Sequence, residues 1–114
     1  MQPLSLDKFG DPLHKFNAIT PSVCNLRPSS RGHIHIKSNH WQDYPAIKLN
    51  YLSTEEDLQV AVEGLKFTRR IMAANTLQPF APQEWKPGPE LQSEVDLAQA
   101  AGDLGTTVFD PVGT

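Results

Sequence analysis

The sequence contains a single cysteine, Cys24, and lacks the self-sufficient catalytic motifs. One cysteine excludes an internal disulfide and any zinc site built on cysteine pairs. The seven glycines never form the G-x-G-x-x-G pattern of a dinucleotide-binding loop or a phosphate-binding loop. No serine stands in a G-x-S-x-G hydrolase pattern, and no H-E-x-x-H zinc-binding pattern occurs. The chain therefore carries no complete catalytic or cofactor-binding motif of these kinds.

Long hydrophobic runs and clustered basic charge are also missing. No apolar run approaches the roughly 18 residues of a membrane-spanning helix, and the N-terminus lacks a basic segment followed by an apolar one. The ten Lys and Arg residues are scattered, and the net charge is -3. A nucleic-acid-binding face would need clustered basic residues. We therefore expect no membrane span, no nucleic-acid partner and a cytoplasmic location, with membrane association of a larger parent protein as the alternative.

The composition suits one small globular domain with short elements. The 114 residues are 39% hydrophobic and 20% charged, and ten prolines predict many turns. A hairpin is predicted from residues 22–27 and 33–37, because residues 28–32 contain the Pro and Gly of a tight turn. Alternating apolar residues predict a third strand over 46–51.

Two helices are predicted after these strands. Ser53 with Glu56 has the form of a capping box, which predicts a helix over 54–74. Ser93 begins a second, shorter helix that stops near Gly105. Short strands followed by helices make this an α+β chain.

Both ends of the chain look cut. Residues 1–21 are irregular, yet they hold more apolar residues than a free linker would, including Phe9, Leu13 and Phe16. The chain stops at Thr114, directly after a strand-like run. We therefore expect a fragment whose lead-in packs against missing parts. Exposed apolar patches and unpaired sheet edges recruit partners, so the isolated fragment is expected to self-associate.

Several side chains could carry chemistry, and each also has a structural interpretation. His33 and His35 share one strand face and could bind a metal, but no third ligand is positioned, so a solvated face is favoured. Cys24 is interpreted as a small core residue rather than a nucleophile.

Basic and aromatic residues leave two further alternatives open. Lys66, Arg69 and Arg70 could bind an anion, although cations near a helix C-terminus are usually structural. The loop aromatics could line a ligand site, although proline-rich loops often hold an aromatic for packing alone. These aromatics are Trp41, Tyr44 and Trp85.

Five ordered segments carry a family resemblance. They read N-L-R-P-S-S-R-G at 25–32, P-A-I at 45–47, N-Y-L-S at 50–53 with Asp57, R-R-I at 69–71, and G-T-T-V-F-D-P-V-G-T at 105–114. Together they resemble the C-terminal region of the glucose-methanol-choline (GMC) oxidoreductases. Residues 3–14 are similar to the bacterial choline-oxidising branch of that family.

This resemblance implies an FAD-dependent parent enzyme. Such an enzyme removes the hydroxyl proton of a small alcohol, here choline giving betaine aldehyde, and passes a hydride to the flavin. Its FAD-binding domain would precede this chain. Residues 1–114 would be a single fragment of the substrate-binding domain, an antiparallel sheet with flanking helices. The fragment alone is expected neither to bind FAD nor to be an active enzyme.

One position departs from the family pattern. The family segment reads His-Pro-Val-Gly-Thr, and its His lies near flavin and substrate, whereas this chain has Asp110. A natural variant, an engineered change and a sequence error would each produce this difference. The resemblance places Asp110 at the catalytic position and Val108 beside the substrate pocket. The rival hypothesis is a free-standing, non-catalytic binding or interaction module.

Overall fold

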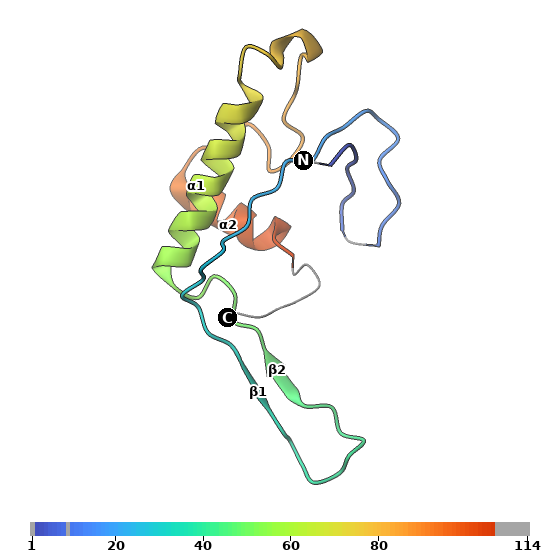
Figure 1. Cartoon of the computed structure of the whole chain (residues 1–114), viewed down its shortest axis with the longest axis vertical. Coiled ribbons are helices and arrows are strands. Elements are labelled where there is room, and N and C mark those ends of the chain that lie inside the picture. Colours follow the sequence, from blue (N-terminus) through green and yellow to red (C-terminus); the bar gives the residue numbers. More distant parts are fainter. Residues whose placement is uncertain (1, 9, 107–114) are drawn as a thin grey trace.

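The fold of the chain is given by a computed structural model that describes residues 2–8 and 10–106. Along the chain it has β1 (His33–His35), β2 (Ala46–Lys48), α1 (Glu55–Met72), the short 3-10 helix η1 (Gln78–Phe80) and α2 (Glu94–Leu104). The hairpin of β1 and β2 projects from one end of α1, and α2 packs against the side of α1 (Figure 1). The molecule is elongated, with extents of 61 × 32 × 22 Å.

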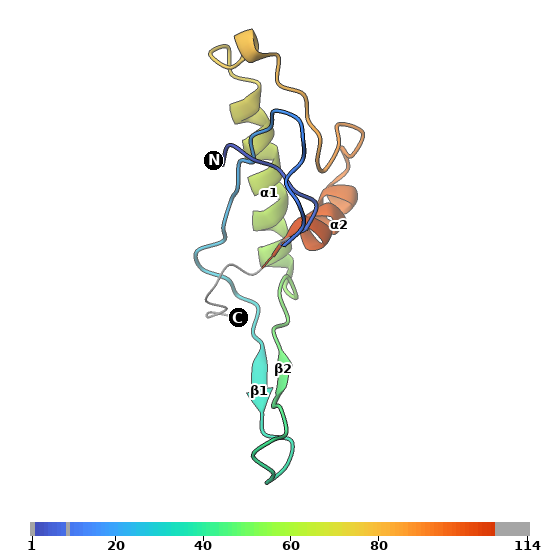
Figure 2. The same ribbon diagram turned by 90° about the vertical axis from the view of Figure 1, so that its right-hand side faces the viewer.

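The two strands form an antiparallel sheet. Its register places His33 opposite Lys48, Ile34 opposite Ile47 and His35 opposite Ala46. Figure 2 shows this hairpin as a narrow ribbon that extends away from both helices. A two-stranded antiparallel sheet with two helices confirms the predicted α+β class.

The predicted pairing of residues 22–27 with 33–37 is wrong. Residues 22–27 form no strand, and β1 pairs with β2 across the loop 36–45. Residues 22–25 run along α1 instead, where a Cβ on Gly64 would meet Val23 Cγ2 at 2.7 Å. The turn expected at 28–32 does not close a hairpin, because the backbone there is hydrogen-bonded to α1.

The third strand is shorter than predicted, ending at Lys48 rather than at residue 51. Asn50 and Leu52 have φ angles of 57° and 51°, in the left-handed region. This backbone cannot continue a strand, so the chain turns here into α1.

The N-cap of α1 lies one residue later than predicted, and the helix begins at residue 55 rather than 54. Thr54 is the N-cap, and its hydroxyl accepts a hydrogen bond from the Asp57 backbone N–H at 3.3 Å. Ser53, the predicted cap, donates its own N–H to Ser30 Oγ at 2.9 Å and belongs to the preceding turn. The predicted basic end is confirmed, since Arg69 and Arg70 lie in the last turn.

The hydrophobic core of the described residues is small. Val62 of α1 and Leu97 and Ala100 of α2 are its fully buried apolar residues. Elsewhere large apolar side chains face solvent, among them Trp41 at 90% and Ile36 at 88% exposure. Many large apolar side chains therefore remain exposed in the described part of the chain.

The lead-in is a closed loop rather than an extended arm. The backbones of Gln2 and Thr20 exchange two hydrogen bonds, of 2.9 and 2.7 Å. Cys24 was predicted to be a core residue within a strand, and both expectations are wrong. It is exposed and lies in no strand, because residues 22–25 follow the outside of α1. Within the described ranges, no helix combines the length and apolar character needed to cross a membrane.

Candidate functional site

A buried carboxylate joins the base of the hairpin to the start of α1. Asp57 is only 2% exposed. It accepts hydrogen bonds from Asn25 Nδ2 at 3.0 Å, from the Ser29 N–H at 2.9 Å and from the Ser30 N–H at 2.8 Å. We call these four residues the polar clasp. Because a buried charge is costly unless it is hydrogen-bonded, these donors fix the path of residues 25–30.

A second set of contacts extends the polar clasp to the end of the hairpin. Asn50 Nδ2 donates to the Arg31 carbonyl and to Ser53 Oγ, each at 3.0 Å. Gly32 lies so close to β2 that a Cβ would meet the Lys48 carbonyl at 2.3 Å. Only glycine fits at this distance. The path of the chain at the base of the hairpin therefore depends on Gly32 as well as on the hydrogen bonds of Asn50.

The polar clasp keeps its carboxylate ionised. The Ser30 hydroxyl and the Ser29 backbone N–H hold the pKa of Asp57 far below its usual range, against the opposing effect of burial. The N-terminus of α1 also favours negative charge at this position. An aspartate so stabilised is a poor proton acceptor near neutral pH, and its role is therefore structural.

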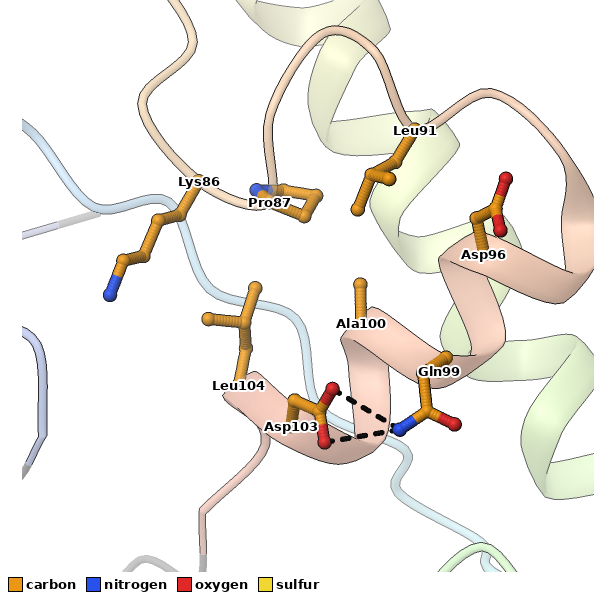
Figure 3. Close-up of a pocket in the computed structure, with 8 residues that line it drawn as sticks. All are labelled: Lys86, Pro87, Leu91, Asp96, Gln99, Ala100, Asp103 and Leu104. Carbon is orange, nitrogen blue, oxygen red and sulfur yellow. Dashed lines mark hydrogen bonds between the residues drawn. The ribbon is translucent and has the colours of Figure 1, made fainter.

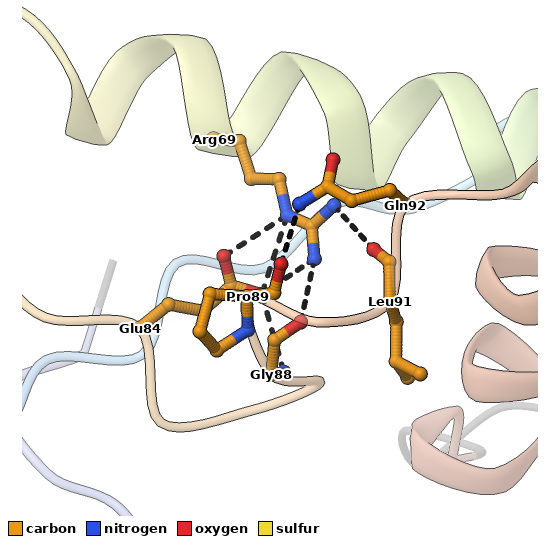
Figure 4. A network of polar contacts seen from close by, with 6 residues as sticks. All are labelled: Arg69, Glu84, Gly88, Pro89, Leu91 and Gln92. Atoms are coloured by element: carbon orange, nitrogen blue, oxygen red, sulfur yellow. Dashed lines mark hydrogen bonds and ion pairs between the residues drawn. The ribbon is translucent and has the colours of Figure 1, made fainter.

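A second polar network holds the proline-rich loop against α1 (Figure 4). Arg69 pairs with Glu84, with Nη2 to Oε1 at 2.7 Å and Nε to Oε2 at 3.0 Å. The same guanidinium donates to the carbonyls of Gly88 at 2.9 Å and Leu91 at 2.8 Å. Arginine suits this place because its fork of donors serves a carboxylate and carbonyls together.

The loop held by this network leads into α2. The loop ends at Ser93, whose hydroxyl accepts from the Asp96 N–H at 3.1 Å and caps α2 as predicted. Lys66 of α1 pairs with Glu94 at 2.8 Å. Helix α2 ends at Leu104, followed by the C-cap Gly105, directly before the segment predicted to be catalytic. The Arg69 network and the Lys66–Glu94 pair thus orient the helix that leads into that segment.

A large open groove lies beside this point. Its volume is about 2120 Å³. It is lined by residues 16–25 of the lead-in, one side of α1, the loop 77–87 and the end of α2 with Gly105 and Thr106. The groove therefore receives the first residues of the segment 105–114. The predicted site residues Val108 and Asp110 lie outside the residues that the structure describes.

A smaller hollow of about 280 Å³ lies between the loop 86–91 and α2 (Figure 3). Its polar groups already have partners: Gln99 donates to Asp103 at 3.1 and 3.2 Å, the Ser93 hydroxyl donates to Asp96 at 2.7 Å, and the Lys86 ammonium pairs with Asp7 at 2.5 Å. This hollow offers no pair of groups arranged for acid–base chemistry.

The predicted aromatic residues do not converge on a ligand site. Trp85 packs edge-on against Phe16, with ring centroids 5.3 Å apart, and against His14 at 6.1 Å. Trp41 and Tyr44 lie on the loop between β1 and β2, both strongly exposed. The packing interpretation therefore holds for Trp85.

Polar contacts mark where the lead-in meets the proline-rich loop. His14 Nδ1 lies 3.1 Å from Ser5 Oγ, and its Nε2 lies 3.3 Å from Asp7 Oδ2. The Lys86 ammonium and then the His14 ring lower the pKa of Asp7. Asp7 is exposed, so these pairs add little stability but define where the lead-in meets the loop.

The basic residues at the end of α1 do not form one anion site. Arg69 is engaged with Glu84, and Lys66 pairs with Glu63 at 2.9 Å and with Glu94. The Arg70 guanidinium lies over the Phe67 ring, 5.8 Å from its centroid. Their charges are therefore divided among separate contacts.

Sequence reasoning missed the principal roles of Asp57 and Glu84. The position of Asp57 in the sequence indicates only a favourable charge in the first turn of a helix, and the one signal of its larger role is that it recurs with the N-L-R-P-S-S-R-G segment among the family segments. Glu84 stands in a proline-rich loop with no periodic pattern. Among the described residues, no cluster of three or more His, Cys, Asp or Glu could hold a metal ion.

The sequence model of the GMC oxidoreductase family matches residues 28–114. This match covers most of the chain and includes the hairpin, the Arg69–Glu84 network, the C-terminal segment and the polar clasp except for Asn25. The chain belongs to the GMC oxidoreductase family, as the five segments predicted.

The chain is similar to several proteins named oxygen-dependent choline dehydrogenase. It is 33% identical over 112 residues to the one from Klebsiella pneumoniae, covering 98% of this chain and 20% of that protein. Identity is 31% over 109 residues for Pseudomonas fluorescens, covering 96% and 19%. For Pseudomonas syringae it is 35% over 98 residues, covering 86% and 17%. The chain thus spans about a fifth of the length of these relatives, and no solved structure matches it.

Proposed function

We propose that this chain is the C-terminal, substrate-binding part of an FAD-dependent alcohol dehydrogenase that oxidises choline to betaine aldehyde. The observation that carries the proposal is the similarity to choline dehydrogenases along 98% of the chain. Asp110 would occupy the catalytic position of the family, and Val108 would line the substrate pocket. Both belong to the segment that follows α2, the helix that the Lys66–Glu94 pair and the Arg69 network tie to α1.

The chemistry of this segment follows from the charge of Asp110. An ionised carboxylate can accept the hydroxyl proton of the substrate, and it attracts a quaternary ammonium group. It opposes the negative charge that develops on the substrate oxygen as the proton leaves, which an imidazole would stabilise. The bound flavin would supply the acceptor for the hydride. Asp110 can therefore fill only part of the family's histidine role.

Anaerobic mixing of the full-length protein with choline tests the proposal. Choline should reduce the flavin within a single turnover, and ethanol should not at the same concentration, because it lacks the ammonium group. Reduction by ethanol but not by choline would contradict choline as the substrate, while the assignment to flavin-dependent alcohol oxidation would stand. No reduction by either, with FAD bound, would contradict the reaction class too.

Family membership implies FAD in the parent protein, but the described residues do not fit its diphosphate. Diphosphates are held by a glycine-rich turn between a parallel strand and a helix. The sheet here has two antiparallel strands. The space beside Gly32, the glycine next to this sheet, is occupied by the backbone of residues 48 and 49. The flavin would be held by other parts of the parent protein.

The 114-residue chain, purified and incubated with FAD, is accordingly expected to stay colourless after gel filtration. The absorbance spectrum of the protein fraction measures this directly. A full-length parent protein treated in the same way is the control and should be yellow. A stoichiometric yellow complex of the 114-residue chain would contradict the expectation.

The isolated chain is expected to self-associate. Ile34, Ile36 and Ile47 are exposed on the hairpin, and both hairpin edges are unpaired in the described sheet. Such edges and apolar faces recruit partners. Light scattering should show a dimer or larger species, and Ile36→Thr should shift it toward monomer. A monomer at high micromolar concentration would contradict this expectation and favour the rival hypothesis of a free-standing module.

A further inference from the structure

Two imidazoles lie next to each other on one face of β1. His33 and His35 are two residues apart in a strand, so their side chains point to the same side. Their ring centroids are 4.7 Å apart, and both residues are exposed. Neither ring belongs to the polar clasp or to the Arg69–Glu84 network, and the proposed oxidation does not use them.

We propose that His33 and His35 form a two-imidazole site for a divalent transition metal, with copper(II) bound most tightly. Metal–nitrogen bonds of about 2.0–2.1 Å require two ligating nitrogens within about 4 Å of each other. Rings whose centroids are 4.7 Å apart meet this by rotation about their terminal torsions, which are soft, without moving the backbone. Imidazole nitrogen suits copper, nickel and zinc, and copper(II) leads the order of affinities.

The fold holds the two ligands in place before the metal arrives. β1 is paired with β2 in a fixed register, and Gly32 lies against the Lys48 and Leu49 carbonyls at its base. Ala46, opposite His35, carries only a methyl group on the face that the two rings share. The remaining coordination positions would be filled by water, because no third His, Cys, Asp or Glu joins the pair among the described residues.

One charge on this face works against the metal. Lys48 is directly opposite His33, and paired residues project to the same side of the sheet. Its ammonium repels a dication across a short, water-screened distance. Lys48→Gln is therefore expected to strengthen copper binding about twofold, which a purely local His-x-His peptide effect would not produce.

Copper(II) titration of the 114-residue chain, followed by its visible absorption band and by electron paramagnetic resonance, tests the proposal. One equivalent should bind, with coupling to two nitrogens. His33→Asn and His35→Asn should each weaken binding at least about tenfold, because a chelate becomes a single ligand. His40→Asn and His14→Asn are matched controls and should bind as tightly as the original chain.

A relocated histidine separates a strand-built site from an incidental one. The double variant Ile34→His with His35→Asn keeps two neighbouring histidines but places them on opposite faces of β1. It should bind copper about as weakly as the single variants. Gly32→Val, which keeps both histidines but disturbs the pairing of β1, should also weaken binding. Binding of either variant as tight as that of the original chain would overturn the proposal.

Discussion

Replacing Asp110 by His in the full-length protein should raise the turnover number at least about tenfold. In the proposed reaction, negative charge develops on the substrate oxygen next to position 110. An imidazole can take up the proton and then stabilise that charge, whereas a carboxylate carries a like charge. General acid–base catalysis contributes roughly 10²–10⁴ in rate, so a tenfold gain is a low expectation.

Stopped-flow reduction of the flavin by choline measures this change directly. The effect should fall mainly on kcat, because the interaction develops in the transition state. Asp110→Asn is the matched control, since it removes the charge without adding an imidazole. The turnover number should rise less with Asp110→Asn than with Asp110→His. An unchanged or slower rate for Asp110→His would show that residue 110 is not at the family's catalytic position.

The helices were predictable because their signals are local. The apolar spacing of α1 and the Ser93 cap of α2 involve neighbours within a few residues. Strand pairing is not local, and residues 22–27 have the composition of a strand. What decides their structure is Gly64, forty residues away, which lets Val23 approach α1. No pattern within 22–27 indicates that contact.

The candidate site also has a part that the sequence predicts and a part that only the fold shows. The family segments were recognisable from residue types and order, yet their physical roles depend on contacts across 27 to 32 residues, from Ser30 and Asn25 to Asp57. The Arg69–Glu84 pair spans 15 residues and joins a helix to a loop without periodicity. Such partners follow from the folded structure, because many carboxylates could satisfy the same arginine.

Asp57→Asn should loosen the base of the hairpin. One oxygen of Asp57 accepts from Asn25 and Ser29, and the other accepts from Ser30. An amide group places its own N–H2 against one of these donors, whichever way it is turned, and leaves that donor unsatisfied. Amide hydrogen exchange at Ser29 and Ser30 should accelerate at least about tenfold, and the melting temperature should fall by roughly 10 °C.

The pH dependence and a neighbouring glutamate make this prediction specific. The pKa of Asp57 is lowered in the fold, so its contribution to stability is fully present above the ordinary value of 3.8 and is lost as the pH falls through its folded-state pKa. The difference between the original chain and Asp57→Asn should therefore be constant near neutral pH and shrink only in stronger acid. Glu56→Gln removes the same charge from the first turn of α1, but Glu56 is exposed, and it should shift the melting temperature by only a degree or two. Equal effects of the two substitutions would show that Asp57 acts through the helix dipole alone and that its hydrogen bonds to residues 25–30 do not hold the hairpin.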